Sequence, residues 1–242
     1  MKYLKTIGSV VTTLIVAANT AAAAPSGRPA FALLRVATDT PKHYAETVRN
    51  TVPTVAAKRA HVLGAGFCRV TAGQSTPGEF RVFTLMDSLA SALDFLASPP
   101  DLPASVTSLR RFQDAAVMIP LKPMSESPPP SGQFATATKT LQVSDPAAFA
   151  KVATALESTV RRNGFPGITL QVYAPLGRGE TQANVILQVI APDTLTLANA
   201  QQYVSSQPAP LKKIHEQAIR LTQADLGEQI AQCEAVYQKQ DR

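Results

Sequence analysis

The sequence predicts an α+β protein made of two copies of one unit, joined in tandem behind an N-terminal leader. Three observations lead to this prediction. The chain has 242 residues, which is long enough for two domains. A segment rich in proline and serine, residues 123–132, reads as a linker. The segments on either side, residues 30–122 and 133–237, show the same order of strand-like and helix-like patterns.

The leader, residues 1–23, has the three parts of a signal peptide. It starts with two lysines, continues through an uncharged and mostly apolar run at 6–18, and ends in alanines. That run is shorter than the roughly 20 residues of a membrane-spanning helix. We therefore expect cleavage between Ala23 and Ala24 and a periplasmic or secreted protein, with no membrane partner after cleavage.

The charge of the chain gives no sign of a nucleic-acid partner. Removing the leader's two lysines lowers the formal net charge from +6 to +4. Nucleic-acid binding usually shows clustered lysine and arginine. The basic clusters here are only pairs, and we expect all three to lie on solvated helix faces: Arg110-Arg111, Arg161-Arg162 and Lys212-Lys213.

Each copy opens with a strand, at 31–37 and 134–143, followed by a helix that begins at a proline. Apolar residues repeat at intervals of three or four in both helices. We expect both to end at a glycine, Gly64 and Gly164, and Pro53 to kink or divide the first.

A hairpin follows in each copy. The second strands are expected at 67–72 and 168–174, and the third at 80–86 and 185–190. The turn at 177–180 joins two strands and is too short to be a phosphate-binding loop.

The second half of each unit begins with a nearly identical helix start, Asp-Ser-Leu at Asp87 and Asp-Thr-Leu at Asp193. Final strands are expected at 115–119 and 226–231, although Gly227 suits a strand poorly. The order strand, helix, strand, strand, helix, strand is that of the ferredoxin-like unit, whose sheet carries helices on one face only.

In element order, paired Asp-Ser/Thr-Leu helix starts and tandem duplication, both units resemble the dimeric α/β-barrel superfamily. This superfamily includes the antibiotic-biosynthesis-monooxygenase-like, EthD-like and NIPSNAP-like domains. The resemblance implies that the two sheets pack open face to open face, as one intramolecular α/β barrel with a ligand site between them. It also implies that closure brings together Cys68 and Cys233, so that a disulfide forms. Two buried free thiols are the alternative.

Polar residues on the predicted strands are the candidate ligand contacts. The first unit carries one arginine on each opening strand, and strand alternation allows each to point away from the helices: Arg35, Arg69 and Arg81. The second unit offers five candidates: Lys139, Gln171, Tyr173, Asn184 and Gln188. They would line a cavity for a polar or anionic ligand; the alternative is that they face solvent at strand ends. Buried arginines need partners, so a closed cavity requires an acidic ligand or matching carboxylates.

The sequence contains no recognisable catalytic or metal-binding motif, and no motif implies a cofactor. His43 and Tyr44, where the first helix starts, are the candidate catalytic residues. The preferred function is a non-catalytic exported module that binds a small molecule. The alternatives are a cofactor-independent monooxygenase or haem-degrading enzyme, which the few histidines disfavour, and a structural or partner-binding protein. Whether the protein is an enzyme and its oligomeric state stay open.

Overall fold

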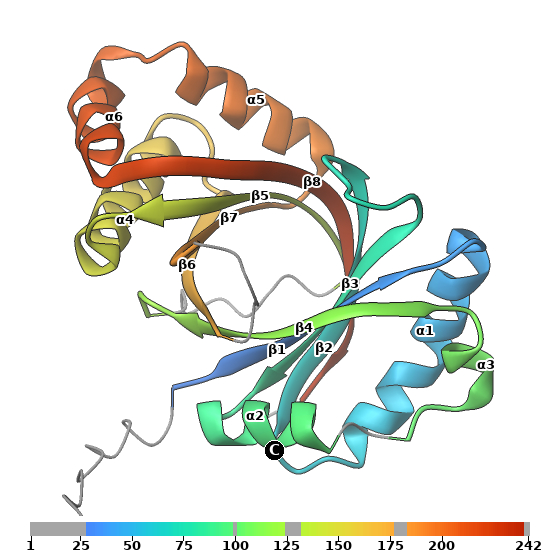
Figure 1. The fold of residues 1–242 in the computed structure, drawn as a ribbon. Helices are drawn as coiled ribbons and strands as arrows, with labels where there is room; N and C mark the ends of the chain where they lie inside the picture. The colour runs from blue at the N-terminus through green and yellow to red at the C-terminus, as the bar shows by residue number, and fades with distance from the viewer. Residues whose placement is uncertain (1–27, 99–100, 124–131, 177–182, 240–242) are drawn as a thin grey trace, which may run out of the picture.

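The computed structural model describes residues 28–98, 101–123, 132–176 and 183–239. Its strands form one closed, antiparallel barrel in the order β1-β3-β2-β8-β5-β7-β6-β4 (Figure 1). The predicted α+β class and the single intramolecular barrel are confirmed. The proposed leader, most of the proposed linker and the turn at 177–180 lie outside the described residues.

The two halves repeat one order of elements. The first half runs β1 (Ala30–Ala37), α1 (Pro41–Ala57), β2 (Val62–Ala72), β3 (Glu79–Met86), α2 (Leu89–Ala97), α3 (Ala104–Thr107) and β4 (Arg111–Pro120). The second half runs β5 (Gly132–Val143), α4 (Pro146–Arg162), β6 (Thr169–Leu176), β7 (Val185–Ala191), α5 (Thr194–Ser205), α6 (Ala209–Leu221) and β8 (Thr222–Gln238). The helices flank the outside of the barrel, α1 to α3 on the first half and α4 to α6 on the second (Figure 1). No helix in the described ranges is long and apolar enough to cross a bilayer.

Two seams join the halves, and each pairs the second strand of one half with the fourth strand of the other. The β2–β8 seam runs from the pair Gly64–Gln238 to the pair Ala72–Ile230. The β4–β6 seam covers only residues 117–120 against 173–176. The barrel is therefore held more extensively along β2 and β8.

Side-chain alternation gives the barrel two packed faces. On the outer face of the first half, Tyr44 and Val48 of α1 pack on Phe67 and Phe80. The inner face carries an aromatic series in edge-on or steeply tilted contact. Its ring centroids are 5.6 Å apart for Phe31–Tyr173, 6.3 Å for Phe31–Phe83 and 6.4 Å for Phe83–Phe134.

The first helix differs from the prediction. α1 is continuous through Pro53 and ends at Ala57, so both the expected division and the expected end at Gly64 are wrong. Gly64 instead lies in β2, where backbone pairing with β3 and β8 extends the strand back to Val62. In the second half Gly164 does follow the end of α4, with φ of +102°, as predicted for a C-terminal cap.

The final strand and one basic pair also differ. β8 has 17 residues, far more than the expected 226–231, and it accommodates Gly227 at φ of +137°. It pairs with β5 along most of its length and with β2 over its second part, and this backbone pairing outweighs poor strand propensity. Arg111 begins β4, so the expectation that Arg110-Arg111 lies in a helix is wrong.

Candidate functional site

A disulfide joins the two halves inside the barrel. Cys68 of β2 and Cys233 of β8 are directly opposed in the strand register, with Cα atoms 3.9 Å apart, and they are bonded. Both are buried beside Phe134 and Ala231, with Phe83 packed against this group. The disulfide therefore lies on the inward face, on the longer of the two seams.

A row of charged side chains crosses three strands next to this disulfide. Arg35 of β1 is opposite Arg81 of β3 on one side and Asp114 of β4 on the other, and we call these three residues the charged row. On its other side, Arg81 of β3 is opposite Cys68 of β2. Arg35 Nη2 lies 2.6 Å from Asp114 Oδ2, and the two side chains are 29% and 38% exposed. Because like charges directly opposite each other are unfavourable, this arrangement favours nearby negative charge.

The guanidinium of Arg35 is only partly matched. Its Nε atom is buried and has no hydrogen-bond partner, although Nη2 contacts Asp114. Next to this pair the strand register shifts, because Val36 pairs with Phe112 and leaves Gln113 as an extra residue. Such β-bulges re-aim side chains and are frequent beside functional sites.

Apolar side chains border the charged row. Leu33 and Phe83 are opposite each other, two positions along their strands from Arg35 and Arg81, and so face the same way. Phe31, the next inward residue of β1, packs with Leu33 against the buried group that includes Tyr173. Leu33, Phe31 and Phe83 are all half-buried, so part of this apolar surface remains accessible.

Sequence reasoning missed Asp114 and the role of the inward phenylalanines. The predicted fourth strand started at residue 115, whereas β4 starts at Arg111. Extending the alternation back from Met118 through Ala116 places Asp114 on the inward face. That alternation was the signal available in the sequence.

Three of the second-half candidates do lie inward, farther from the charged row. Gln171 and Gln188 are paired across β6 and β7, and Gln188 is also opposite Thr138 of β5. Tyr173, in the same group as Met118, is buried, and burial raises the pKa of its hydroxyl far above the usual value. It therefore stays neutral and contributes an aromatic wall.

For Arg69 and Lys139, the expectation that they line the interior of the barrel is wrong. Arg69 shares a strand face with Phe67, which packs on α1, and its side chain is exposed. Lys139 also points outward, and its Nζ lies 3.2 Å from an Asp225 carboxylate oxygen and 3.6 Å from one of Glu228 on β8. The sequence of a strand shows which side chains share a face, because successive side chains alternate. It does not show which of the two faces packs against the helices.

Asn184 has a structural role. Its amide bonds both backbone groups of Val143: Oδ1 accepts from the backbone N–H at 2.8 Å, and Nδ2 donates to the backbone carbonyl at 2.7 Å. These contacts tie the start of β7 to the end of β5.

His43 and Tyr44 do not form a common site. His43 is exposed, whereas Tyr44 is buried with its ring centroid 5.1 Å from that of Phe80. Desolvation raises the pKa of Tyr44, and Arg110 partly opposes that rise. The two side chains thus lie on different faces of α1.

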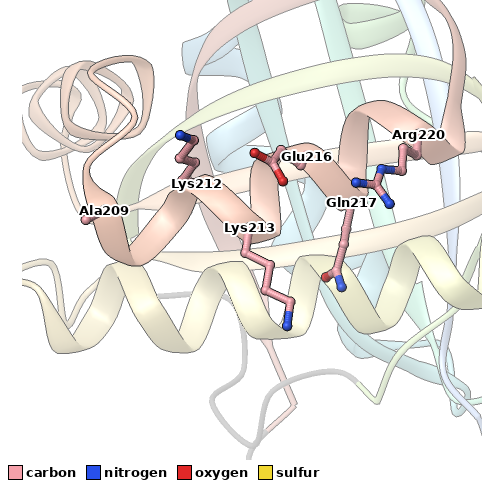
Figure 2. Close-up of a pocket in the computed structure, with 6 residues that line it drawn as sticks. All are labelled: Ala209, Lys212, Lys213, Glu216, Gln217 and Arg220. Atoms are coloured by element: carbon pink, nitrogen blue, oxygen red, sulfur yellow. The ribbon is translucent and has the colours of Figure 1, made fainter.

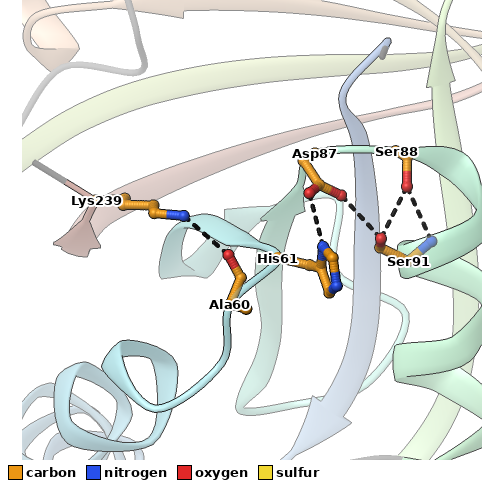
Figure 3. Close-up of polar contacts among 6 residues, drawn as sticks. All are labelled: Ala60, His61, Asp87, Ser88, Ser91 and Lys239. Atoms are coloured by element: carbon orange, nitrogen blue, oxygen red, sulfur yellow. Dashed lines mark hydrogen bonds and ion pairs between the residues drawn. The ribbon is translucent and has the colours of Figure 1, made fainter. Parts of the chain in front are cut away.

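A second histidine lies in a polar cluster at the start of α2 (Figure 3). His61 Nδ1 is 2.8 Å from Asp87 Oδ2, and Ser91 Oγ donates to Asp87 Oδ1 at 2.8 Å. The serine thus contacts the carboxylate rather than the imidazole, which differs from a nucleophilic triad, where the serine contacts the histidine. Since Ser88 caps α2 through the Ser91 N–H, this cluster fixes a helix start.

A surface hollow lies over the polar face of α6 (Figure 2). Its described lining comes from this helix alone: Ala209, Lys212, Lys213, Glu216, Gln217 and Arg220. Lys212 and Arg220 are each four residues from Glu216, the spacing at which opposite charges on a helix attract each other. The hollow therefore has the character of a solvated helix face.

The histidines do not fit a histidine-ligated haem inside the barrel. All three histidines of the sequence are described. His43 is on α1, His61 precedes β2 on the outer surface, and His215 is on α6, where it contacts Gln207. In the described residues there is also no group of three or more side chains suited to hold a metal ion.

The fold is an α/β barrel that closes within one chain. Solved structures share this fold. A proposed monooxygenase from Lactobacillus acidophilus aligns with a TM-score of 0.55 and 10% identity, over 86% of this chain and 94% of that one. A second proposed monooxygenase, from Fusobacterium nucleatum, aligns with a TM-score of 0.53 and 10% identity, over 87% and 93%. A variant of chlorite dismutase from Candidatus Nitrospira defluvii aligns with a TM-score of 0.52 and 10% identity, over 87% and 92%.

At this identity the likeness concerns the fold alone. No protein-family model matches the chain, and no curated protein matches it by sequence.

Proposed function

We propose that the chain is an exported, non-catalytic binding module that holds a small anionic molecule on the inward face of its barrel. Export is supported by the leader pattern at residues 1–23. The observation that carries the binding proposal is the charged row. Two arginines lie side by side on the inward face, and one of them, Arg35, has a buried Nε that lacks an acceptor.

An anion would improve this site in two ways. It would accept the unmade hydrogen bond of Arg35, since leaving a buried donor unsatisfied costs about 1–3 kcal/mol. It would also lower the repulsion between two opposed guanidinium groups. The side chain of Arg35 is 29% exposed, so part of it is accessible to such a molecule.

The other readings have less support. The hypothesis of a monooxygenase rests on the fold alone, because the candidate catalytic residues, His43 and Tyr44, do not form a common site. A purely structural role does not account for an unpaired donor in a partly accessible charged row.

Native mass spectrometry of the protein purified from its own compartment tests the proposal. We expect wild type to retain a small anion or to bind added sulfate or acetate, and Arg35→Gln to lose this binding. Arg69→Gln is the matched control, because Arg69 is exposed on the outer face. Equal binding by wild type and Arg35→Gln would rule out the charged row as the site.

A further inference from the structure

We infer that the ligand is an aromatic carboxylate, and that Asp114 occupies the place on Arg35 that the ligand's carboxylate takes. This inference rests on the proposed function and names its ligand class. Three features of the inward face carry it: the way Asp114 contacts Arg35, the position of Asp114 in β4, and the apolar surface beside the row.

The contact between Asp114 and Arg35 is incomplete when compared with another arginine–carboxylate pair of the same molecule. Arg49 binds Glu234 through both Nε and Nη2, at 2.6 and 2.7 Å. Asp114 Oδ2 lies 2.6 Å from Nη2 of Arg35, whereas Nε of Arg35 has no acceptor. The planar fork of arginine matches a carboxylate best when two parallel hydrogen bonds form. A free carboxylate can adopt that geometry, whereas Asp114 is constrained by its backbone.

Asp114 lies where it can give way. It follows the extra residue Gln113 of the β-bulge, and its side chain is 38% exposed. The paired stretch of β4 with β6 begins only at Val117, so in the described residues this part of β4 pairs with β1 alone. When Asp114 leaves Arg35, its carboxylate can turn to water, and this limits the cost of exchange.

The apolar surface next to the row indicates an aromatic body for the ligand. Phe31 and Phe83 are in edge-on contact at 6.3 Å, and with Leu33 they remain half-buried. Aromatic rings prefer such edge-on or offset contacts, and these contacts stabilise a packed ring beyond its buried area. An inorganic anion would use the arginine and leave this surface in contact with water. The carboxylate would thus lie on Arg35 with its ring toward Phe31 and Phe83.

Isothermal titration calorimetry with 2-naphthoate and the neutral 2-naphthamide tests this inference on the intact protein. We expect the carboxylate to bind wild type at least about tenfold more tightly than the amide, because a hydrogen bond to a charged group is stronger than one to a neutral group. Asp114→Asn should tighten naphthoate binding by about tenfold, since it removes a competing carboxylate. Arg35→Gln should weaken it by at least about tenfold, and Arg69→Gln should change it less than about twofold.

The outcomes separate this inference from the proposed function. If sulfate binds in an Arg35-dependent way and naphthoate does not, the binding site stands and the aromatic carboxylate is wrong. If Asp114→Asn weakens naphthoate binding or leaves it unchanged, Asp114 orients Arg35 and does not hold the ligand's place. Arg35→Lys keeps the positive charge without the planar fork, and equal affinity in that variant would overturn the two-bond contact. Circular dichroism of each variant confirms that it is folded.

Discussion

Some charged side chains of this protein have a partner for each polar atom that the structure describes as buried, and others do not. This difference separates structural residues from candidate binding residues. The side chains of Lys122 and Glu157 are each only 9% exposed and form an ion pair. Glu157 also accepts from the Leu170 backbone N–H at 3.2 Å and lies 3.6 Å from Arg161. This carboxylate is well matched, unlike the guanidinium of Arg35 in the charged row.

Replacing Glu157 with glutamine should lower the free energy of unfolding by about 3 kcal/mol, because it leaves the Lys122 ammonium buried without its counter-charge. Urea unfolding followed by circular dichroism measures the change. Glu216→Gln, on the exposed face of α6, should change stability by less than about 0.5 kcal/mol. A loss of the same size in both variants would show that the buried pair has no special role.

Asp87 predicts a pH dependence at the start of α2. The hydrogen bond from His61, with those from Ser91 and Ser88, lowers the pKa of Asp87. A carboxyl whose folded pKa lies below its unfolded value of about 3.9 adds stability above that pH and loses it as pH falls through the folded pKa. The stability difference between wild type and Asp87→Asn should therefore be positive at pH 6 and shrink as pH falls below about 4.

Unfolding curves between pH 6 and pH 2 measure this difference. The control is Asp101→Asn, which removes the same charge from an exposed loop between α2 and α3. If both differences follow the same pH dependence, general charge effects rather than the His61–Asp87 contact are responsible.

Among the elements, the two second helices show what the sequence could and could not predict. The matching Asp-Ser-Leu and Asp-Thr-Leu signals correctly mark two helix starts. In the structure the caps differ by one position: Ser88 caps α2, whereas Asp193 caps α5. Asp87 is free to bind His61 only because Ser88 takes the cap. Local sequence shows which residues can cap a helix. Whether Asp87 or Ser88 caps α2 depends also on His61, 26 positions away.

α1 carries a proline at a position where a helix normally loses stability. Pro53 has no N–H for the carbonyl of Arg49, and α1 nevertheless continues to Ala57. Packing of Tyr44 and Val48 on the barrel compensates for this loss. The local sequence predicted that Pro53 divides the first helix, because it does not show how the helix packs on the barrel.

Pro53→Ala should raise the free energy of unfolding by about 1–2 kcal/mol, since the recovered helix hydrogen bond outweighs the greater freedom of the unfolded chain. Pro41→Ala is the matched control, because a proline in the first turn removes no helix hydrogen bond. Thermal and urea unfolding compare the two. A gain in Pro41→Ala equal to that in Pro53→Ala would show that the recovered helix hydrogen bond is not the cause.

In the whole molecule, the sequence predicted the two halves and their closure better than it predicted the site. Repeated element order indicated the units, and the resemblance indicated the barrel. Of the residues expected to contact a ligand, Arg35, Arg81 and Tyr173 face inward, whereas Arg69 and Lys139 face outward. Which strand face meets the helices depends on register and bulges, and these are set by pairing between distant strands.

The Cys68–Cys233 disulfide connects the halves across 165 positions of sequence. In the chain-entropy model, closing a loop of this length stabilises the folded chain by about 5 kcal/mol through its effect on the unfolded state. The Cys68→Ala/Cys233→Ala variant should therefore lose roughly 4–5 kcal/mol of unfolding free energy, with a small further loss from reduced packing beside Phe134. Urea unfolding with and without reductant separates the two contributions.

Reductant should destabilise wild type and leave the double variant unchanged. Arg49 and Glu234 provide a second link between the halves, from α1 to β8, which reductant does not affect. If wild type unfolds at the same urea concentration with and without reductant, and mass analysis shows that the disulfide was reduced, pairing along β2 and β8 holds the barrel closed without it. If reductant instead lowers the stability of wild type as predicted, the disulfide and the β2–β8 pairing together hold the barrel closed around the charged row.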